Sequence, residues 1–136
     1  MEITFFVTLY DNDKYEPNNS IETATQIQSG QSIDFTLLYG DSDYFAITTT
    51  KQSQFISVQA KSAERFFVDI YDSTGANVGS DQINTSRSTV VFCTSDIGTY
   101  YLRFSYYHQS SLQPITASFV STLLDNDTNE PNDTKA

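Results

Sequence analysis

Short stretches in which apolar and polar residues alternate fill most of the chain, and turn residues separate them. Ile33 to Leu37 alternates clearly, and in a later run Phe66, Val68 and Ile70 share one face. A period of two is typical of a β-strand with one buried side. Further runs of this kind lie at 44–49, 54–60, 76–78, 88–94, 99–107 and 115–124. About eight short strands with frequent turns predict an all-β fold, an antiparallel β-sandwich that is jelly-roll-like.

Two local signals refine this pattern. The run Asp72-Ser73-Thr74-Gly75 predicts a hairpin turn, with Gly75 in the left-handed conformation that glycine tolerates. The segment from Ile21 to Ile27 favours a single helical turn, for which Asn19 or Ser20 is a suitable N-cap. No other segment favours a helix, so the predicted fold class does not change.

The composition agrees with a strand-rich domain. The chain has 136 residues with 10 Phe, 9 Tyr and no Trp, and strand-forming residues dominate over the usual helix formers. This length is enough to bury one core without disulfides. The single cysteine, Cys93, follows the apolar run Val90-Val91-Phe92, and we expect it to be a small buried side chain.

The charge of the chain limits its partners. It carries 17 acidic and 7 basic residues, for a net charge of −10, and Lys and Arg form no cluster. We therefore expect no binding to nucleic acid or to anionic membranes, since both attract basic surfaces. No apolar run approaches the length of a membrane span, so membrane insertion is not expected either. An acidic surface does suit a hard cation where several carboxylates converge.

The two ends of the chain carry the same sequence pattern. Residues 5–20 align with residues 119–134 at a constant offset of 114, and 9 of the 16 positions are identical. Each copy contains a strand, an Asp-Asn-Asp turn and a Glu-Pro-Asn motif in the same order. A match of this length in one register indicates a tandem repeat.

One repeat unit is therefore expected to run from residue 11 to residue 124. Residues 1–10 are then the last strand of a preceding repeat, or the edge of a cut fragment, and residues 125–136 are the flexible start of a following repeat. The strand near residues 3–10 duplicates the one at 115–124, although a single sandwich has one slot for it. We expect this spare strand to pair with an exposed sheet edge, which predicts a strand-mediated dimer.

The sharpest motif is Glu16-Pro17-Asn18-Asn19 at the start of the unit. Pro17 favours an extended conformation at Glu16, so the oxygen-bearing side chains are presented from a stiff segment. For this tetrapeptide alone, a plain polar turn is the alternative. Further carboxylates lie upstream and about one hairpin away, at Asp11, Asp13, Asp41 and Asp43. Because calcium takes about six to eight oxygen ligands in irregular geometry, these segments predict a calcium site between strands.

Three groups of residues, taken together, resemble one family. They are Asp13 to Ser20 with Glu22-Thr23-Ala24, then Gly40-Asp41-Ser42-Asp43-Tyr44-Phe45, then Gly98-Thr99-Tyr100-Tyr101-Leu102. In order and spacing they resemble the bacterial pre-peptidase C-terminal domain, whose relatives include the collagen-binding domains of clostridial collagenases. The resemblance covers residues 11–124. It implies a jelly-roll-like sandwich attached to secreted enzymes or surface proteins, often in tandem.

In the collagenase branch, the resemblance also implies calcium held between the Glu-Pro-Asn segment and the acidic turn. The matching positions of this chain are Glu16, Asn18, Asn19, Asp41 and Asp43. That branch has a further acidic ligand two residues before the glutamate, where this chain has Lys14. Asp13, one position earlier, is the candidate substitute.

Four tyrosines are candidates for a ligand-binding face, namely Tyr100, Tyr101, Tyr106 and Tyr107. An aromatic face of this kind suits an extracellular protein or a glycan. The alternative is that strand alternation places at least two of the four in the sandwich core. The last hairpin, residues 108–115, lacks the exposed tyrosines of the collagen-binding branch, so collagen binding is not predicted.

No catalytic constellation is visible in the sequence. Its single histidine, His108, lies in a polar turn, and no nucleophile elbow, zinc-ligand spacing or phosphate-binding glycine loop occurs. We expect a non-catalytic, calcium-binding accessory or spacer module of a secreted or cell-surface bacterial protein. Such a module would aid the folding, secretion or substrate targeting of a hydrolase. The alternative is a structural or adhesive repeat of a surface protein with no enzyme attached.

Overall fold

The computed structural model describes residues 18–37, 42–62, 65–106 and 115–125. Nine strands lie within these residues, preceded by the short 3-10 helix η1 (Ile21–Thr23). The strands are β1 (Thr25–Gln26), β2 (Ser32–Leu37), β3 (Ser42–Thr48), β4 (Phe55–Lys61), β5 (Phe66–Tyr71), β6 (Asn77–Ile83), β7 (Thr89–Cys93), β8 (Thr99–Ser105) and β9 (Ile115–Leu124).

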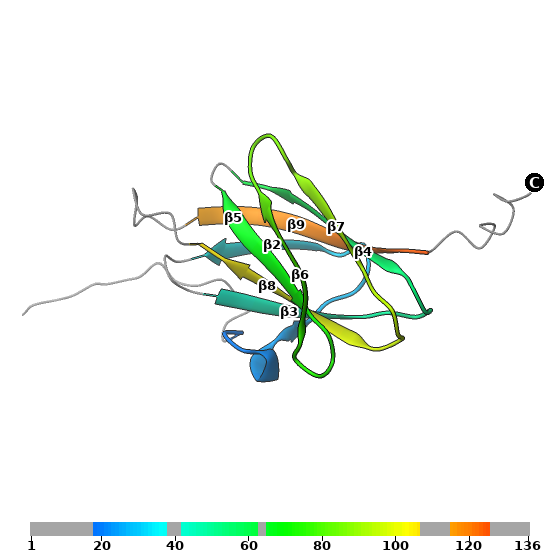
Figure 1. Ribbon diagram of the computed structural model, residues 1–136. Coiled ribbons are helices and arrows are strands. Elements are labelled where there is room, and N and C mark those ends of the chain that lie inside the picture. The colour runs from blue at the N-terminus through cyan, green and yellow to red at the C-terminus, as the bar shows by residue number, and fades with distance from the viewer. Residues whose placement is uncertain (1–17, 38–41, 63–64, 107–114, 126–136) are drawn as a thin grey trace, which may run out of the picture.

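Two sheets pack face to face (Figure 1). One has five strands in the order β1-β3-β8-β5-β6, and the other has four in the order β2-β9-β4-β7. All pairings are antiparallel except that of β1 with β3. From β2 to β9 the chain changes sheet at nearly every connection, as in a jelly roll. The predicted β-sandwich is therefore confirmed.

Strand alternation explains which residues form the core. In β5 the inward residues Phe66, Val68 and Ile70 are each 0% exposed, whereas the residues between them are half-buried. The strands β2, β4, β7 and β8 follow the same rule, because successive side chains of a strand point to opposite faces. The side chains of the two inner faces meet between the sheets.

Phe35 of β2 lies at the centre of an aromatic cluster that joins the two sheets. Its ring is 5.4 Å from that of Phe119 in its own sheet. It is 5.1 Å from Phe104 and 6.0 Å from both Phe45 and Phe66, which belong to the other sheet. Several of these pairs are edge-to-face, the arrangement that aromatic rings favour in cores. This cluster accounts for much of the apolar burial between the sheets.

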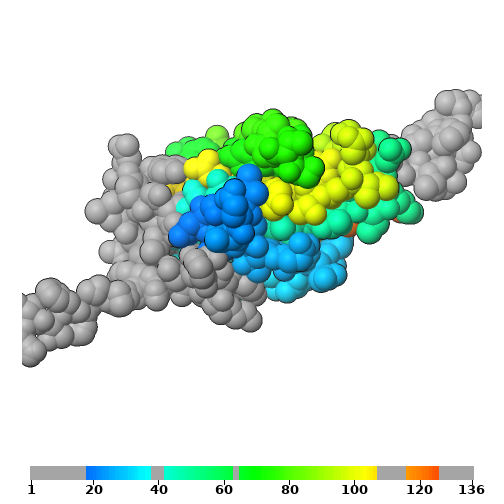
Figure 2. Space-filling view, turned by 90° about the horizontal axis from the view of Figure 1, so that it is seen from below, coloured from blue at the N-terminus to red at the C-terminus, as the bar shows by residue number. Residues whose placement is uncertain are grey.

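Two elements differ from the sequence-based expectation. The strand expected near residues 76–78 is longer and runs as β6 from Asn77 to Ile83. The segment expected to form one helical turn contains η1 and then β1, which pairs with β3. Ser20 caps η1, and its amide donates to Thr23 Oγ1 at 3.1 Å. In Figure 2 this segment (blue) lies at the surface beside the β5–β6 hairpin (green).

Candidate functional site

The segment that leads into the sandwich lies against the beginning of β3. The carbonyl oxygen of Asn18 accepts a 2.7 Å hydrogen bond from the amide of Tyr44. Further along, β1 runs parallel to β3, and the amide of Ile27 donates to the carbonyl of Ala46 at 2.8 Å. The segment from Asn18 to Ile27 is thus tied to β3 near both of its ends.

Asp43 is buried at the beginning of β3, on the face that packs into the core. Asp43, Phe45 and Ile47 alternate onto this inner face, with exposed fractions of 0%, 0% and 1%. Asn18 is also 0% exposed. Removing a carboxylate from water is costly unless cations or hydrogen bonds replace its hydration. Asn18 and Asp43 both carry side-chain oxygens of the type that calcium prefers, and the bond between the Asn18 carbonyl and the Tyr44 amide places the two residues near each other.

Three of the six predicted calcium ligands lie within the described residues. Asn18 and Asp43 are brought together, whereas Asn19 is exposed. The other three lie outside the described residues: Asp13, Glu16 and Asp41. In the described part of the chain, no three or more His, Cys, Asp or Glu side chains are grouped so as to hold a metal ion. The calcium site therefore stays a prediction, with Asn18 and Asp43 as its buried members within the described residues.

The four candidate ligand-face tyrosines separate into different environments. Tyr100 and Tyr106 are 5% and 1% exposed and belong to the core. The hydroxyl of Tyr100 donates to the carbonyl of Asp96 at 3.0 Å, which gives its buried polar end a partner. Tyr101 is half-buried on the outer face of the five-stranded sheet, and Tyr107 lies outside the described residues. The alternation argument, under which at least two of the four belong to the core, is thus confirmed.

Two further tyrosines, Tyr44 and Tyr71, lie on the same outer face as Tyr101, and the sequence analysis did not identify them as part of a ligand face. The rings of Tyr44 in β3 and Tyr71 in β5 lie 6.2 Å apart with an angle of 35° between their planes. Tyr71 pairs directly with Tyr101 across the β5–β8 ladder. All three are half-buried on the outer side of the sheet. The alternation pattern of the sequence could have predicted this, since Tyr44 and Tyr71 occupy outward positions of alternating strands.

Arg103 of β8 links these tyrosines to polar groups. Its Nε donates to Ser42 Oγ at 3.0 Å, and its Nη1 donates to Tyr71 Oη at 3.4 Å. The same Nη1 lies 3.5 Å from Asp69 Oδ2, and both side chains of this ion pair are partly shielded from solvent. We call Tyr44, Tyr71, Tyr101 and Arg103 the tyrosine face. It combines flat apolar rings with hydrogen-bonding groups held in fixed positions.

Cys93 differs from the sequence-based expectation, because its side chain is exposed. Alternation in β7 points Val90 and Phe92 inward, so Cys93 faces outward at the end of the strand. It lines a surface hollow of about 320 Å³ together with Val78 and Ile97. The apolar run that precedes Cys93 in the sequence therefore did not determine its environment.

Similarity to known proteins is seen at the level of structure. No family model matches the sequence, and no curated protein matches it. The pre-peptidase C-terminal domain of a collagenase from Bacillus anthracis is similar, with a TM-score of 0.59 and 20% sequence identity. The likeness covers 77% of this chain and 100% of that domain. The expected likeness to this kind of domain is thus confirmed for the fold.

Two further solved structures are more distant. PliG from Aeromonas hydrophila, a periplasmic inhibitor of g-type lysozyme, has a TM-score of 0.48 and 12% identity, covering 74% of this chain and 96% of its own. CsCBM6-3 from Clostridium stercorarium, in complex with cellobiose, has a TM-score of 0.44 and 11% identity, covering 73% of this chain and 96% of its own.

Within the described residues, no helix has the length and apolar character of a membrane span.

Proposed function

We propose that this chain is a non-catalytic accessory or spacer module of a secreted or cell-surface bacterial protein. The unit spans residues 11–124, residues 1–10 end a preceding copy, and residues 125–136 begin a following copy. The repeated sequence at the two ends supports this arrangement. A fold shared with the pre-peptidase C-terminal domain of a collagenase supports it as well. Its neighbours in the parent chain are further copies of the unit or a catalytic domain.

The module binds calcium where the entry segment meets β3. The observation that carries this proposal is the full burial of Asp43 beside Asn18. A divalent cation would offset the cost of burying the Asp43 carboxylate and would join two segments that are distant in sequence. Glu16, Asp41 and Asp13 are the remaining carboxylates of the proposed site, with Asn19 as an additional ligand. Calcium would then stabilise the point at which one unit follows another.

Calorimetric titration of the full chain with calcium tests this site. We expect one calcium ion to bind, and Asp43→Asn to weaken the affinity about tenfold or more, which corresponds to about 1.4 kcal/mol. Asp34→Asn is the matched control, because Asp34 is an exposed carboxylate of β2. Equal calcium affinity of the native chain and the Asp43→Asn variant would contradict the proposal.

A second function is favoured by the tyrosine face, which we propose as the contact surface for an extracellular ligand. Half-buried rings stack well on the apolar faces of sugars, while Arg103, Asp69 and Ser42 offer hydrogen bonds to hydroxyl groups. A glycan matches this combination better than a purely apolar ligand does. A protein segment is the other candidate.

Binding of soluble oligosaccharides and of extracellular protein fragments, each measured by NMR chemical shifts, tests this surface. We expect shifts at Tyr44, Tyr71 and Tyr101, and loss of binding in Tyr71→Ala. Val91→Ala is the control, because Val91 is exposed on the other sheet. If only protein ligands shift these tyrosines, the surface is a protein-binding face. If no ligand shifts them, the second function is rejected.

The non-catalytic nature of the module predicts no turnover of peptide, ester or glycoside substrates by the purified chain. Activity that is lost in His108→Ala or in a paired Asp41→Asn and Asp43→Asn variant would overturn this proposal. The sequence around the unit in its parent protein separates the two roles proposed for the module. A neighbouring protease domain favours the accessory role, whereas further copies and a surface anchor favour the structural one.

A further inference from the structure

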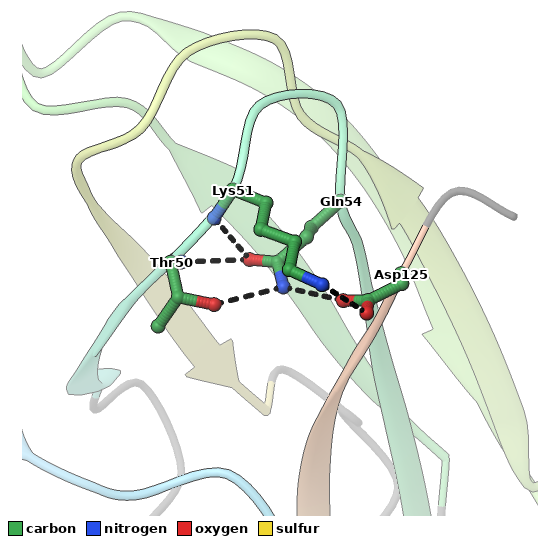
Figure 3. A network of polar contacts seen from close by, with 4 residues as sticks. All are labelled: Thr50, Lys51, Gln54 and Asp125. Carbon is green, nitrogen blue, oxygen red and sulfur yellow. Dashed lines mark hydrogen bonds and ion pairs between the residues drawn. The ribbon is translucent and has the colours of Figure 1, made fainter. Parts of the chain in front are cut away.

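Asp125, the first residue after β9, is held by the loop between β3 and β4. Its Oδ2 lies 2.8 Å from Lys51 Nζ, and its Oδ1 accepts a 2.8 Å hydrogen bond from Gln54 Nε2 (Figure 3). Both carboxylate oxygens are therefore engaged by side chains of one loop. These bonds, first that of Lys51 and then that of Gln54, lower the pKa of the Asp125 carboxyl.

Gln54 is arranged in advance to receive this carboxylate. It is 2% exposed, and its Oε1 accepts hydrogen bonds from the amides of Thr50 and Lys51 at 2.8 and 3.2 Å. One hydrogen of its Nε2 is used by Thr50 Oγ1 at 3.0 Å. The other hydrogen is directed to Asp125 (Figure 3). With the loop fixing the amide in this way, little conformational freedom is lost when the carboxylate binds.

The loop itself is firmly supported. Ser53 has a φ of 60°, a left-handed conformation that is uncommon for a residue other than glycine. Its amide donates to the carbonyl of Ser95 at 2.8 Å. The carbonyl of Gln54 accepts bonds from the amide and the hydroxyl of Thr94, at 3.0 and 2.6 Å. Residues that impose a strained loop in this way often serve a specific contact.

The position of Asp125 in the repeat indicates what this contact is for. Asp125 aligns with Asp11 in the repeat, so it is the residue at which the unit starts again. We propose that Lys51 and Gln54 form a socket for the first carboxylate of the following copy, and that this socket fixes the direction in which the next copy leaves. The partner is thus a second copy of this module in the same chain. This inference rests on the proposed tandem arrangement and not on calcium binding.

Pulsed electron-electron resonance on the full chain tests the socket. Cys93→Ser removes the native thiol, so that spin labels attach only at the introduced cysteines of Ser88→Cys and Thr128→Cys. Ser88 lies beside Ala60, near the end of β4 opposite to the socket. We expect a narrow distance distribution with the socket intact, and a distribution about twice as wide in Asp125→Ala. Lys51→Met should give an intermediate width.

A control variant and a second measurement distinguish the socket from a general effect of losing an ion pair. Asp81→Ala removes the carboxylate from another ion pair of similar length, Arg87–Asp81 at 2.9 Å, and should leave the distribution unchanged. The NMR order parameter of the residue 125 amide should fall from about 0.85 to below about 0.6 in Asp125→Ala. A wide distribution in the native chain, or equal order in both chains, would overturn the inference.

The parent sequence provides an independent check. Any neighbouring copy that is followed by a further copy should carry Lys-x-x-Gln, or an Arg in place of the Lys, at the positions of residues 51–54. If a copy that begins with Asp follows a copy that lacks this Lys (or Arg) and Gln pair, the proposed socket is wrong. That outcome would leave the calcium site untouched, because Asn18 and Asp43 take no part in the socket.

Discussion

Asn18 and Asp43 are both fully buried and are held side by side, because the carbonyl oxygen of Asn18 accepts a hydrogen bond from the residue that follows Asp43. The bond, from the Tyr44 amide, is 2.7 Å long. It brings the entry segment onto the first residues of β3, which lie more than twenty positions further along the chain. The start of the unit is thus coupled to the first residues of β3, the second strand of the five-stranded sheet.

Calcium is expected to stabilise the fold through this pair. At a hundredfold excess of calcium over its dissociation constant, the free energy of unfolding should rise by about 2.7 kcal/mol. The rise should disappear in Asp43→Asn and persist in Asp34→Asn. Urea unfolding in calcium and in chelator measures it. Magnesium should be a poor substitute, because it demands octahedral geometry and loses its water reluctantly. An equal response of all three chains to calcium would rule out this site.

Gly79 is expected to be essential for the approach of β6 to β7. A Cβ at this position would lie 2.8 Å from Cδ1 of Phe92 and 3.1 Å from Cγ2 of Ile70. Gly79→Ala should therefore lower the free energy of unfolding by about 1–3 kcal/mol through overpacking. Gly98→Ala is the control, because its nearest neighbour, Ser73 Oγ, is 4.0 Å away. It should be neutral or stabilising by about 0.4–1 kcal/mol. Similar effects of the two changes in urea unfolding would refute the packing argument.

Gly79 also illustrates why part of the fold could not be predicted. Strands with apolar residues at every second position, such as β5, were predicted because alternation depends on nearby residues alone. The stretch from Gly79 to Gln82 has no apolar residue, so β6 was recognised only at its start. The two-residue strand β1 carries no pattern at all. Its pairing with β3 arises from a contact that is distant in sequence.

The candidate sites likewise divide into features that a local sequence motif predicts and features that depend on contacts distant in sequence. The sequence analysis assigned Asn18 and Asp43 to one predicted calcium site, and the structure places Asn18 against the beginning of β3. The calcium site itself stays a prediction. The sequence analysis did not predict the tyrosine face, which depends on the order of β3, β8 and β5 in the sheet. Lys51 and Gln54 have the character of ordinary turn residues. Their contact with Asp125 depends on where β9 ends relative to the β3–β4 loop.

Asp72 is expected to make the β5–β6 turn sensitive to acid. Its Oδ1 accepts bonds from the hydroxyl and amide of Thr74, at 2.6 and 2.9 Å, and from the amide of Ala76 at 3.1 Å. The Thr74 hydroxyl is the largest of the causes that lower the pKa of Asp72 below 3.8. A lowered pKa in the folded state contributes stability above pH 3.8, and this is lost as the pH falls through the folded value.

Thr74→Val tests this relationship. The pKa of Asp72, followed by NMR of its carboxyl carbon, should rise toward 3.8 when the hydroxyl is removed. The part of the acid-induced loss of stability that comes from Asp72 should then become smaller, because the pKa values of the folded and unfolded states approach each other. Thr85→Val is the control, because Thr85 is an exposed residue of the turn between β6 and β7. An unchanged pKa in Thr74→Val would show that the backbone amides alone are responsible.

The duplicated strand gives the last prediction. β9 occupies a central position in the four-stranded sheet and pairs with β2 on one side and β4 on the other. Its sequence counterpart, Ile3 to Tyr10, lies outside the described residues. Because β9 already fills this position, the counterpart has no such place in the same unit. Each large apolar side chain that it leaves in water costs about 1.5–3 kcal/mol relative to burial.

We therefore expect the full chain to associate through this segment. Within the described residues, β2 and β7 are the outer strands of the four-stranded sheet, and pairing with an added strand would satisfy the backbone groups of both partners. Light scattering should show a dimer for the full chain and a monomer for a version that begins at Asp11. Val7→Lys is the matched control, since it keeps the length of the segment but disrupts its apolar face, and it should also favour the monomer. If all three chains are monomeric at high concentration and equally stable, the segment does not pair with a sheet edge and the predicted dimer is wrong.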